Sequence, residues 1–252
     1  MLVSIVIPYY NDKKNIKSSV LSALSQTYKN TEIIIIDNEN SLSSRSILNK
    51  ILKISKKIKI LNNKILNYAG VGRNLGISYS KGDLIAFLDS DDLWSKEKLK
   101  LQVKELINKK IDILFTNYKA IDVKKKILYS VKSPSIITFK DLIQACPVCL
   151  SSSLIRKKCF ENNKFKNLKT KEDYELWLNF SKSGYRIRTL NHFLTFYRVR
   201  SSSLSSLHIN KIKNAFLIYY KFQNFSTYYS IFCVLRLYYN AFKKKFCNYE
   251  KK

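Results

Sequence analysis

The chain has 252 residues, of which 46% are hydrophobic and 13% aromatic, which is enough to bury a substantial core and excludes a largely disordered protein. Its formal net charge of +28 has three open explanations: a compositional bias toward lysine, attraction to an anionic membrane surface, or binding of nucleic acid. Nucleic acid is the least favoured, because no basic segment interleaves with aromatic residues as in RNA-binding modules.

The first half of the chain predicts strands that alternate with helices. Leu2–Ile7 is a continuous apolar run that stops at Pro8, as in a strand buried on both faces. Further strands are predicted at Glu32–Ile36, Ile58–Leu61, Leu84–Leu88 and Ile111–Thr116, and helices at Asp12–Leu24, Ser44–Lys57, Arg73–Ser80 and Lys96–Asn108. This order predicts an α/β fold with a mainly parallel sheet flanked by helices.

The second half of the chain is less regular. Lys124–Lys126 predicts a turn between extended segments, and Phe139–Ala145 a short helix. Ser151–Ile155 and Phe193–Val199 have the composition of strands. Thr170–Ser183 predicts a helix that Gly184 closes.

The end of the chain has a helical pattern that is unusually aromatic and basic. It runs from Ile209 to Phe246, and basic residues such as Lys221 and Arg236 lie among its aromatic side chains. We therefore expect a main domain at residues 1–205 and a helical tail at 206–252. Two possibilities stay open for this tail: it lies on an anionic membrane surface, or it packs on the main domain.

Polar residues gather where the predicted parallel strands end. Tyr10 and Asn11 follow the first strand, Asp37 and Asn38 follow the second, and the stretch Asp89-Ser90-Asp91-Asp92 follows the fourth. In open parallel sheets, ligands bind beyond the carboxyl ends of the strands. We expect these residues to share one edge of the sheet.

The acidic stretch after the fourth strand indicates a cation site. Three aspartates within four residues repel one another unless a cation neutralises them. Mg²⁺ and Mn²⁺ prefer oxygen ligands and bridge to phosphate oxygens, so Asp89 and Asp91 are candidate metal ligands. The alternative is a solvated acidic turn in which Asp92 caps the following helix.

Two other clusters have both a chemical and a structural interpretation. Gly70–Gly76 surrounds Arg73 at a helix start, where glycines and an arginine suit a phosphate. This signal is weak alone, and the absence of a P-loop sequence argues against an ATPase. At the later helix, Thr170 and Asp173 have the spacing of a capping box, and the same helix end could position Asp173 as a catalytic carboxylate.

The cysteines and the N-terminal segment predict a cytoplasmic location. The five cysteines are odd in number and irregularly spaced, which disfavours a disulfide framework, and the lone pair Cys146 and Cys149 is interpreted as ordinary thiols. The first apolar run lacks the basic region of a signal peptide, and no run has the length of a membrane span. Peripheral attachment to the inner membrane face is compatible with the basic tail.

Taken together and in this order, these motifs resemble family 2 glycosyltransferases, which have a GT-A fold. The resemblance covers about residues 2–205. The matching segments are Val3–Asn11, Ser25–Tyr28, Glu32–Asp37, Gly72–Gly76, Lys81–Trp94, Glu172–Trp177, and Tyr197-Arg198 followed by Ser203. Three positions depart from the usual pattern: Asn38 stands where a second aspartate is frequent, Gly72 replaces an alanine, and Lys96 stands where proline is common.

The resemblance implies a role for each matching residue. Tyr10 would stack on the base, and Asp91 would be the main metal ligand with Asp89 as its partner. Asp173 would be the general base. The residues implied in binding a nucleotide-sugar are Pro8, Tyr10, Asp37, Asn38, Arg73 and Asp89.

The activity implied by the resemblance is an inverting sugar transfer that depends on Mn²⁺ or Mg²⁺. The donor would be a nucleotide-sugar, with UDP expected, and the acceptor a glycan or a polyprenyl-diphosphate-linked sugar in bacterial surface polysaccharide synthesis. A nucleotidyltransferase of related fold is the first alternative, although the glycine- and lysine-rich loop that it needs is missing near Pro8. A basic nucleic-acid-binding protein is the second, but it leaves the strand-end aspartates unexplained.

Overall fold

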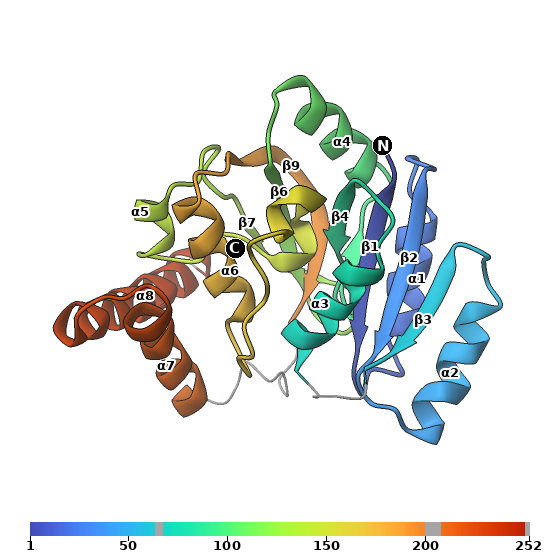
Figure 1. The fold of residues 1–252 in the computed structure, drawn as a ribbon, viewed down its shortest axis with the longest axis horizontal. Helices are drawn as coiled ribbons and strands as arrows, with labels where there is room; N and C mark the ends of the chain where they lie inside the picture. The colour runs from blue at the N-terminus through green and yellow to red at the C-terminus, as the bar shows by residue number, and fades with distance from the viewer. Residues whose placement is uncertain (64–67, 200–207, 250–252) are drawn as a thin grey trace.

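A computed structural model describes residues 1–63, 68–199 and 208–249. These residues build one sheet with the strand order β3-β2-β1-β4-β8-β6-β9-β5, and β7 pairs with β6 (Figure 1). The four strands from the first part of the chain run parallel to one another, as predicted. They are β1 (Val3–Tyr9), β2 (Thr31–Asp37), β3 (Ile58–Asn62) and β4 (Leu84–Phe87).

The rest of the sheet contains both parallel and antiparallel pairs. The remaining strands are β5 (Leu93–Trp94), β6 (Ile113–Ile121), β7 (Ile127–Val131), β8 (Leu154–Arg156) and β9 (Ile187–Arg198). β8 lies antiparallel between β4 and β6, in the place where the next parallel strand was expected. A strand of three residues has too short an apolar pattern to reveal its direction or its neighbours.

Helices cover both faces of the sheet because successive strand residues point to opposite sides. Ile33 and Ile35 of β2 pack in one buried cluster with α1 (Ile16–Leu24), α2 (Leu42–Leu52) and α4 (Lys98–Asn108). Ile34 and Ile36 pack in the other cluster. That second cluster includes α3 (Ala69–Tyr79), α5 (Phe139–Leu142) and α6 (Glu172–Lys182).

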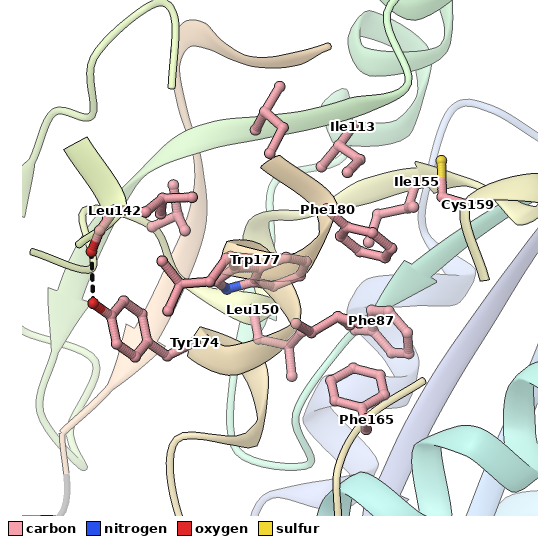
Figure 2. Packing of buried hydrophobic residues seen from close by; sticks show 14 of the residues in the cluster. Phe87, Ile113, Leu142, Leu150, Ile155, Cys159, Phe165, Tyr174, Trp177 and Phe180 are labelled. Carbon is pink, nitrogen blue, oxygen red and sulfur yellow. Dashed lines mark hydrogen bonds between the residues drawn. The ribbon is translucent and has the colours of Figure 1, made fainter. Parts of the chain in front are cut away.

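Aromatic side chains fill the core on the α6 face (Figure 2). The Trp177 ring of α6 meets the Phe115 ring of β6 edge-on, with centroids 4.9 Å apart. Phe87, at the end of β4, meets Phe165 in the same way at 5.3 Å. These contacts fix α6 against β6, and the segment before α6 against the end of β4, where the acidic turn begins.

The C-terminal tail packs on this same core, which is one of the two possibilities left open by its sequence. It consists of α7 (His208–Leu217), the π-helical turn Ile218–Phe222, and α8 (Thr227–Tyr249). Six of its side chains are buried in the α6-face cluster: Ala215, Ile218, Tyr219, Cys233, Val234 and Leu237. None of the helices in the described part of the chain is both long and apolar enough to cross a bilayer.

Substitution of Gly76 tests the close packing of α3 on β1. A Cβ on residue 76 would lie 2.5 Å from Cγ1 of Val6 in β1, so we expect Gly76→Ala to lower the free energy of unfolding by about 1–3 kcal/mol. Urea denaturation measures this loss.

Ser78→Ala, on the exposed side of the same helix, is the control and should leave the midpoint unchanged. The double variant Val6→Ala/Gly76→Ala should lose less than the sum of the two single losses, because the clash is gone. Additive losses would contradict the steric explanation.

Candidate functional site

The carboxyl ends of the first parallel strands lie at one edge of the sheet, as predicted. Tyr10 follows β1 and is 50% exposed, so its ring is open to solvent, whereas Pro8 is buried inside the strand. Asp37 and Asn38 lie at and just past the end of β2, and the acidic turn begins two residues after β4. Two other elements reach this edge, namely α3 and the start of α6.

Arg73 of α3 joins these elements through two ion pairs. One guanidinium nitrogen, Nη2, lies 2.7 Å from Oδ1 of Asp89, and the other, Nη1, lies 2.6 Å from Oε1 of Glu172. The arginine side chain is only 5% exposed, and it stacks 5.5 Å from the centroid of the Phe165 ring. The acidic turn is therefore connected to the first residue of α6 through one buried cation.

The charges around Arg73 keep it ionised despite its burial. Burial alone would lower the pKa of the guanidinium, but Asp89 and Glu172 outweigh that effect and hold its pKa above the usual value. Burial conversely raises the pKa of Glu172, with Arg73 opposing the shift and Asp173 adding to it. A buried pair of this kind is costly to break, because the remaining charge would lose its partner.

Asp92 is a buried anchor of the turn, which contradicts its proposed role as a helix cap. Its Oδ2 accepts a hydrogen bond from the Ser151 hydroxyl at 2.5 Å, and its Oδ1 accepts one from the Arg198 backbone N–H at 2.8 Å. The following helix, α4, begins instead at Lys98 after Glu97. Burial, followed by the charges of Asp91 and Asp89, raises the pKa of Asp92 well above the usual value.

Two more side chains fix the backbone of the acidic turn. The Arg198 Nε donates to the carbonyl of Asp91 at 2.8 Å. The Ser19 hydroxyl of α1 points at the carbonyls of Asp89, Ser90 and Asp92. The turn is thus held from α1 and from the end of β9, and its carboxylates are presented in a fixed arrangement.

The residues of the turn fit a hard divalent cation. Asp89 and Asp91 supply carboxylate oxygens from a turn whose third carboxylate is already used inside the protein. Among residues 1–63, 68–199 and 208–249, no group of three or more histidine, cysteine or acidic side chains is placed to hold a metal ion. An ion here would therefore take its other oxygens from a diphosphate and water, as Mg²⁺ and Mn²⁺ commonly do.

Asp173 lies one residue after the partner of Arg73, but not in a capping box. Lys171 precedes α6 in a left-handed conformation with φ 64°, and no side chain caps the helix. Thr170 instead accepts hydrogen bonds from Asn214 of α7, so the predicted capping box is wrong. Burial raises the pKa of Asp173, and Arg73 opposes this shift.

Asp37 and Asn38 are occupied by contacts within the protein. The Asp37 carboxylate accepts hydrogen bonds from the backbone N–H groups of Glu39 and Asn40 and from the Ser44 hydroxyl. Asn38 is 1% exposed, and its Oδ1 accepts a hydrogen bond from Asn63. In this structure both side chains hold the loop after β2 in place through these hydrogen bonds.

Two of the departures from the usual family pattern, Gly72 and Asn38, are in contact. A Cβ on residue 72 would lie 2.5 Å from Oδ1 of Asn38, which is too close for an alanine without movement. Gly72 therefore makes room for the buried Asn38 amide next to α3. The helix start that carries Arg73 is seated by this contact.

A large groove lies elsewhere in the structure, away from the acidic turn. It is a groove of about 1260 Å³ beside the outer face of α3, lined among others by Val71, Leu75, Phe160, Lys81 and Lys164. None of the three carboxylates of the acidic turn lines it, nor does Asp173. The candidate site therefore rests on converging side chains and not on cavity size.

The sequence alone did not identify three residues of this site. Glu172 and Arg198 were part of matching motifs but had no assigned role, and Ser151 carried no signal as a site residue. Ser151 and Arg198 are 59 and 106 positions away from Asp92 in the chain. A contact over such a separation leaves no local pattern that a single sequence could reveal.

Removal of Glu172 tests the buried bridge. We expect Glu172→Ala to lower the free energy of unfolding by about 3 kcal/mol, because Arg73 stays buried with one partner fewer. Glu161→Gln, on an exposed carboxylate, is the control. Equal denaturation midpoints for the two variants would show that the bridge contributes nothing to stability.

Comparison with known proteins identifies the family. The model of glycosyl transferase family 2 matches residues 4–176. The chain is 39% identical over 212 residues, 84% of this chain and 82% of the other, to the Escherichia coli UDP-Glc:alpha-D-GlcNAc-diphosphoundecaprenol beta-1,3-glucosyltransferase WfaP. It is 27% identical over 245 residues, 97% of each chain, to the putative teichuronic acid biosynthesis glycosyltransferase TuaG of Bacillus subtilis.

The same fold is found among solved structures. The crystal structure of residues 1–349 of S. aureus TarS superposes with a TM-score of 0.71 at 18% identity, covering 94% of this chain and 70% of that one. The similarity confirms the GT-A-like α/β architecture expected from the sequence motifs. With the family model matching more than half of its residues, the chain belongs to glycosyl transferase family 2.

Proposed function

We propose that this glycosyltransferase moves a sugar, with inversion, from a UDP-sugar to a hydroxyl of a polyprenyl-diphosphate-linked acceptor in bacterial surface polysaccharide synthesis. The names of WfaP and of a second E. coli relative, WfgD, specify UDP-glucose and a diphosphoundecaprenol-linked GlcNAc acceptor. WfgD is 33% identical to this chain over 215 residues. UDP-glucose is therefore the first donor to test, and a lipid-linked GlcNAc the first acceptor.

One observation carries the proposed chemistry: Arg73 pairs with both Asp89 and Glu172. Through it, the acidic turn that suits a diphosphate lies beside the helix start that carries a carboxylate. A donor and a base must be close for a single displacement at the anomeric carbon. The pairing supports donor binding on the Asp89 side of the arginine and proton removal from the acceptor on the Glu172 side.

The donor half of the proposed site is the strand edge. Tyr10, exposed past β1, would stack on the base, and Asp89 and Arg73 would face the ribose and diphosphate. Pro8, Asp37 and Asn38 would shape the floor behind them. A Mn²⁺ or Mg²⁺ ion held by Asp91 and Asp89 would stabilise negative charge on the diphosphate.

The acceptor half is the start of α6. Asp173 would take the proton from the acceptor hydroxyl while the oxygen of that hydroxyl forms a bond to the anomeric carbon. The bond from that carbon to the diphosphate oxygen breaks in the same step, and its electron pair leaves with the nucleoside diphosphate. Attack from the face opposite the leaving group inverts the anomeric configuration.

A donor screen with Mn²⁺ tests the activity. The purified chain is incubated with individual nucleotide-sugars and a short-chain lipid-linked GlcNAc, and the released nucleotide is identified. Release of UDP that depends on the acceptor supports the proposal. Release of pyrophosphate would indicate nucleotidyl transfer and contradict it.

Asp91 is the first residue to test within the donor site. Asp91→Ala should abolish the part of UDP-sugar binding that depends on Mn²⁺, because the cation loses its main protein ligand. Isothermal titration with and without Mn²⁺ measures the difference. Asp122→Asn, in the turn before β7, is a matched aspartate control and should keep the Mn²⁺-dependent part of binding. Loss of that part in the control, or its survival in Asp91→Ala, would exclude Asp91 as the main metal ligand.

Asp173→Asn tests the base. The amide cannot take a proton, so transfer should fall by about 10²- to 10⁴-fold while UDP-sugar binding is kept. Burial raises the pKa of Asp173, and only the deprotonated carboxylate can act as a base. As pH is lowered, the wild-type rate should therefore begin to fall at a higher pH than it would with an aspartate of ordinary pKa. Glu161→Gln serves again as control, and full activity of Asp173→Asn would show that another group is the base.

The proposal extends to the location of the enzyme and to its two parts. A polyprenyl-linked acceptor is held in a membrane, so we place the enzyme at the cytoplasmic membrane face as a peripheral protein. Residues 1–205 would carry the chemistry, and residues 206–252 would serve attachment. The exposed apolar side chains of α8 are consistent with this attachment.

A further inference from the structure

The outer face of α8 is apolar and largely exposed to solvent. We call its side chains the outer stripe, and their exposed fractions range from 46% to 88%. Figure 1 shows α7 and α8 in red at one end of the molecule, beside α5 and α6. The outer stripe consists of Tyr228, Ile231, Phe232, Leu235, Tyr239 and Phe242.

The stripe lies opposite the buried side of the same helix. Its members recur every three or four residues, so they share one helix face. Cys233, Val234 and Leu237 recur in the same way half a turn away and are buried in the cluster on the α6 face of the sheet. One apolar face is sufficient to pack a helix on the protein core. A second, exposed apolar face therefore indicates contact with something outside this core.

The charge around the stripe indicates what covers it. Residues 208–249 contain no aspartate or glutamate. Their basic residues are Lys211, Lys213, Lys221, Arg236, Lys243, Lys244 and Lys245. Aromatic and aliphatic side chains flanked by lysine and arginine, without acidic residues, are typical of helices that lie in an anionic lipid interface.

A second copy of the chain is a poorer match for the stripe. Each copy carries a formal charge of +28, and residues 208–249 offer no acidic side chain to pair with the basic residues of a second tail. Self-association through this face would bring like charges together. The helix also cannot cross a bilayer, so binding would place it flat on the surface.

The inner side of the tail contacts the chain next to the candidate base. Asn214 donates to Thr170 at 3.0 and 3.2 Å, three residues before Asp173. The Tyr219 and Tyr174 hydroxyls lie 2.6 Å apart. The Lys171 ammonium lies 5.5 Å from the centroid of the Tyr238 ring in α8.

We infer that the outer stripe of α8 binds an anionic lipid surface and thereby holds the Asp173 end of α6 near the membrane. The first half stands on exposure and charge alone. The second half rests on the proposed lipid-linked acceptor, which would reach the site from that surface. Removal of the whole tail is not a suitable test, because its inner residues are part of the core.

Vesicle flotation of the full chain tests the inference. The variant Leu235→Ser/Tyr239→Ser/Phe242→Ser removes half of the stripe without touching buried residues. Leu42→Ser/Tyr79→Ser/Val123→Ser is the matched control, since these side chains are equally exposed but lie outside the tail. Vesicles of phosphatidylglycerol and phosphatidylcholine are compared with phosphatidylcholine alone.

We expect the wild type and the control to float with the anionic vesicles, and the stripe variant to partition about tenfold less. UDP release with a water-soluble acceptor analogue should be equal in all three proteins. Loss of that release in the wild type would contradict the proposed function and leave the flotation result standing.

Equal flotation of the stripe variant and the wild type would overturn the inference, as would absence of wild-type flotation. A wild type that is dimeric by light scattering, with a monomeric stripe variant, would assign the stripe to a second copy and overturn it as well.

Discussion

The buried guanidinium of Arg73 is the interaction on which the rest of the site depends. Its side chain pairs with both the turn after β4 and the start of α6. A cation buried to this extent is stable only with anionic partners, so the two carboxylates and the arginine fix one another. Gly72 and Gly76 let the helix that carries Arg73 lie close to Asn38 and Val6. The glycines of α3 thus allow the close packing that positions the Arg73 guanidinium, and they do not form a phosphate-binding loop in this structure.

The acidic turn divides its carboxylates between structure and chemistry. Asp92 is bound by Ser151 and by the backbone of Arg198, so the turn is anchored from the far end of the chain. The anchoring leaves Asp89 and Asp91 as the pair that suits a cation and a diphosphate. On the other side of Arg73, the tail helices support the start of α6 through Asn214 and Tyr219. The tail therefore belongs to the architecture of the site even though it adds no residue to the proposed chemistry.

The sequence predicted those parts of the fold that rest on local patterns. The parallel strands at Val3–Tyr9 and Thr31–Asp37 were predicted because a buried strand is a continuous apolar run, and their order placed Tyr10 and Asp89 at one edge. It predicted an extended segment at Ser151–Ile155 but not the antiparallel position of β8 between β4 and β6. It also did not predict the left-handed Lys171 that replaces a capping box. The partners of Asp92 and Arg73 were missed because they come from distant segments, which only the folded chain brings together.

The most direct test of this account is a crystal structure of the full chain with UDP and Mn²⁺. We predict the diphosphate and the ion at the turn after β4, with Asp91 as a ligand, the base against Tyr10, and Arg73 still paired with Glu172. A nucleotide bound in the groove beside the outer face of α3, or an ion held away from Asp89 and Asp91, would contradict the account.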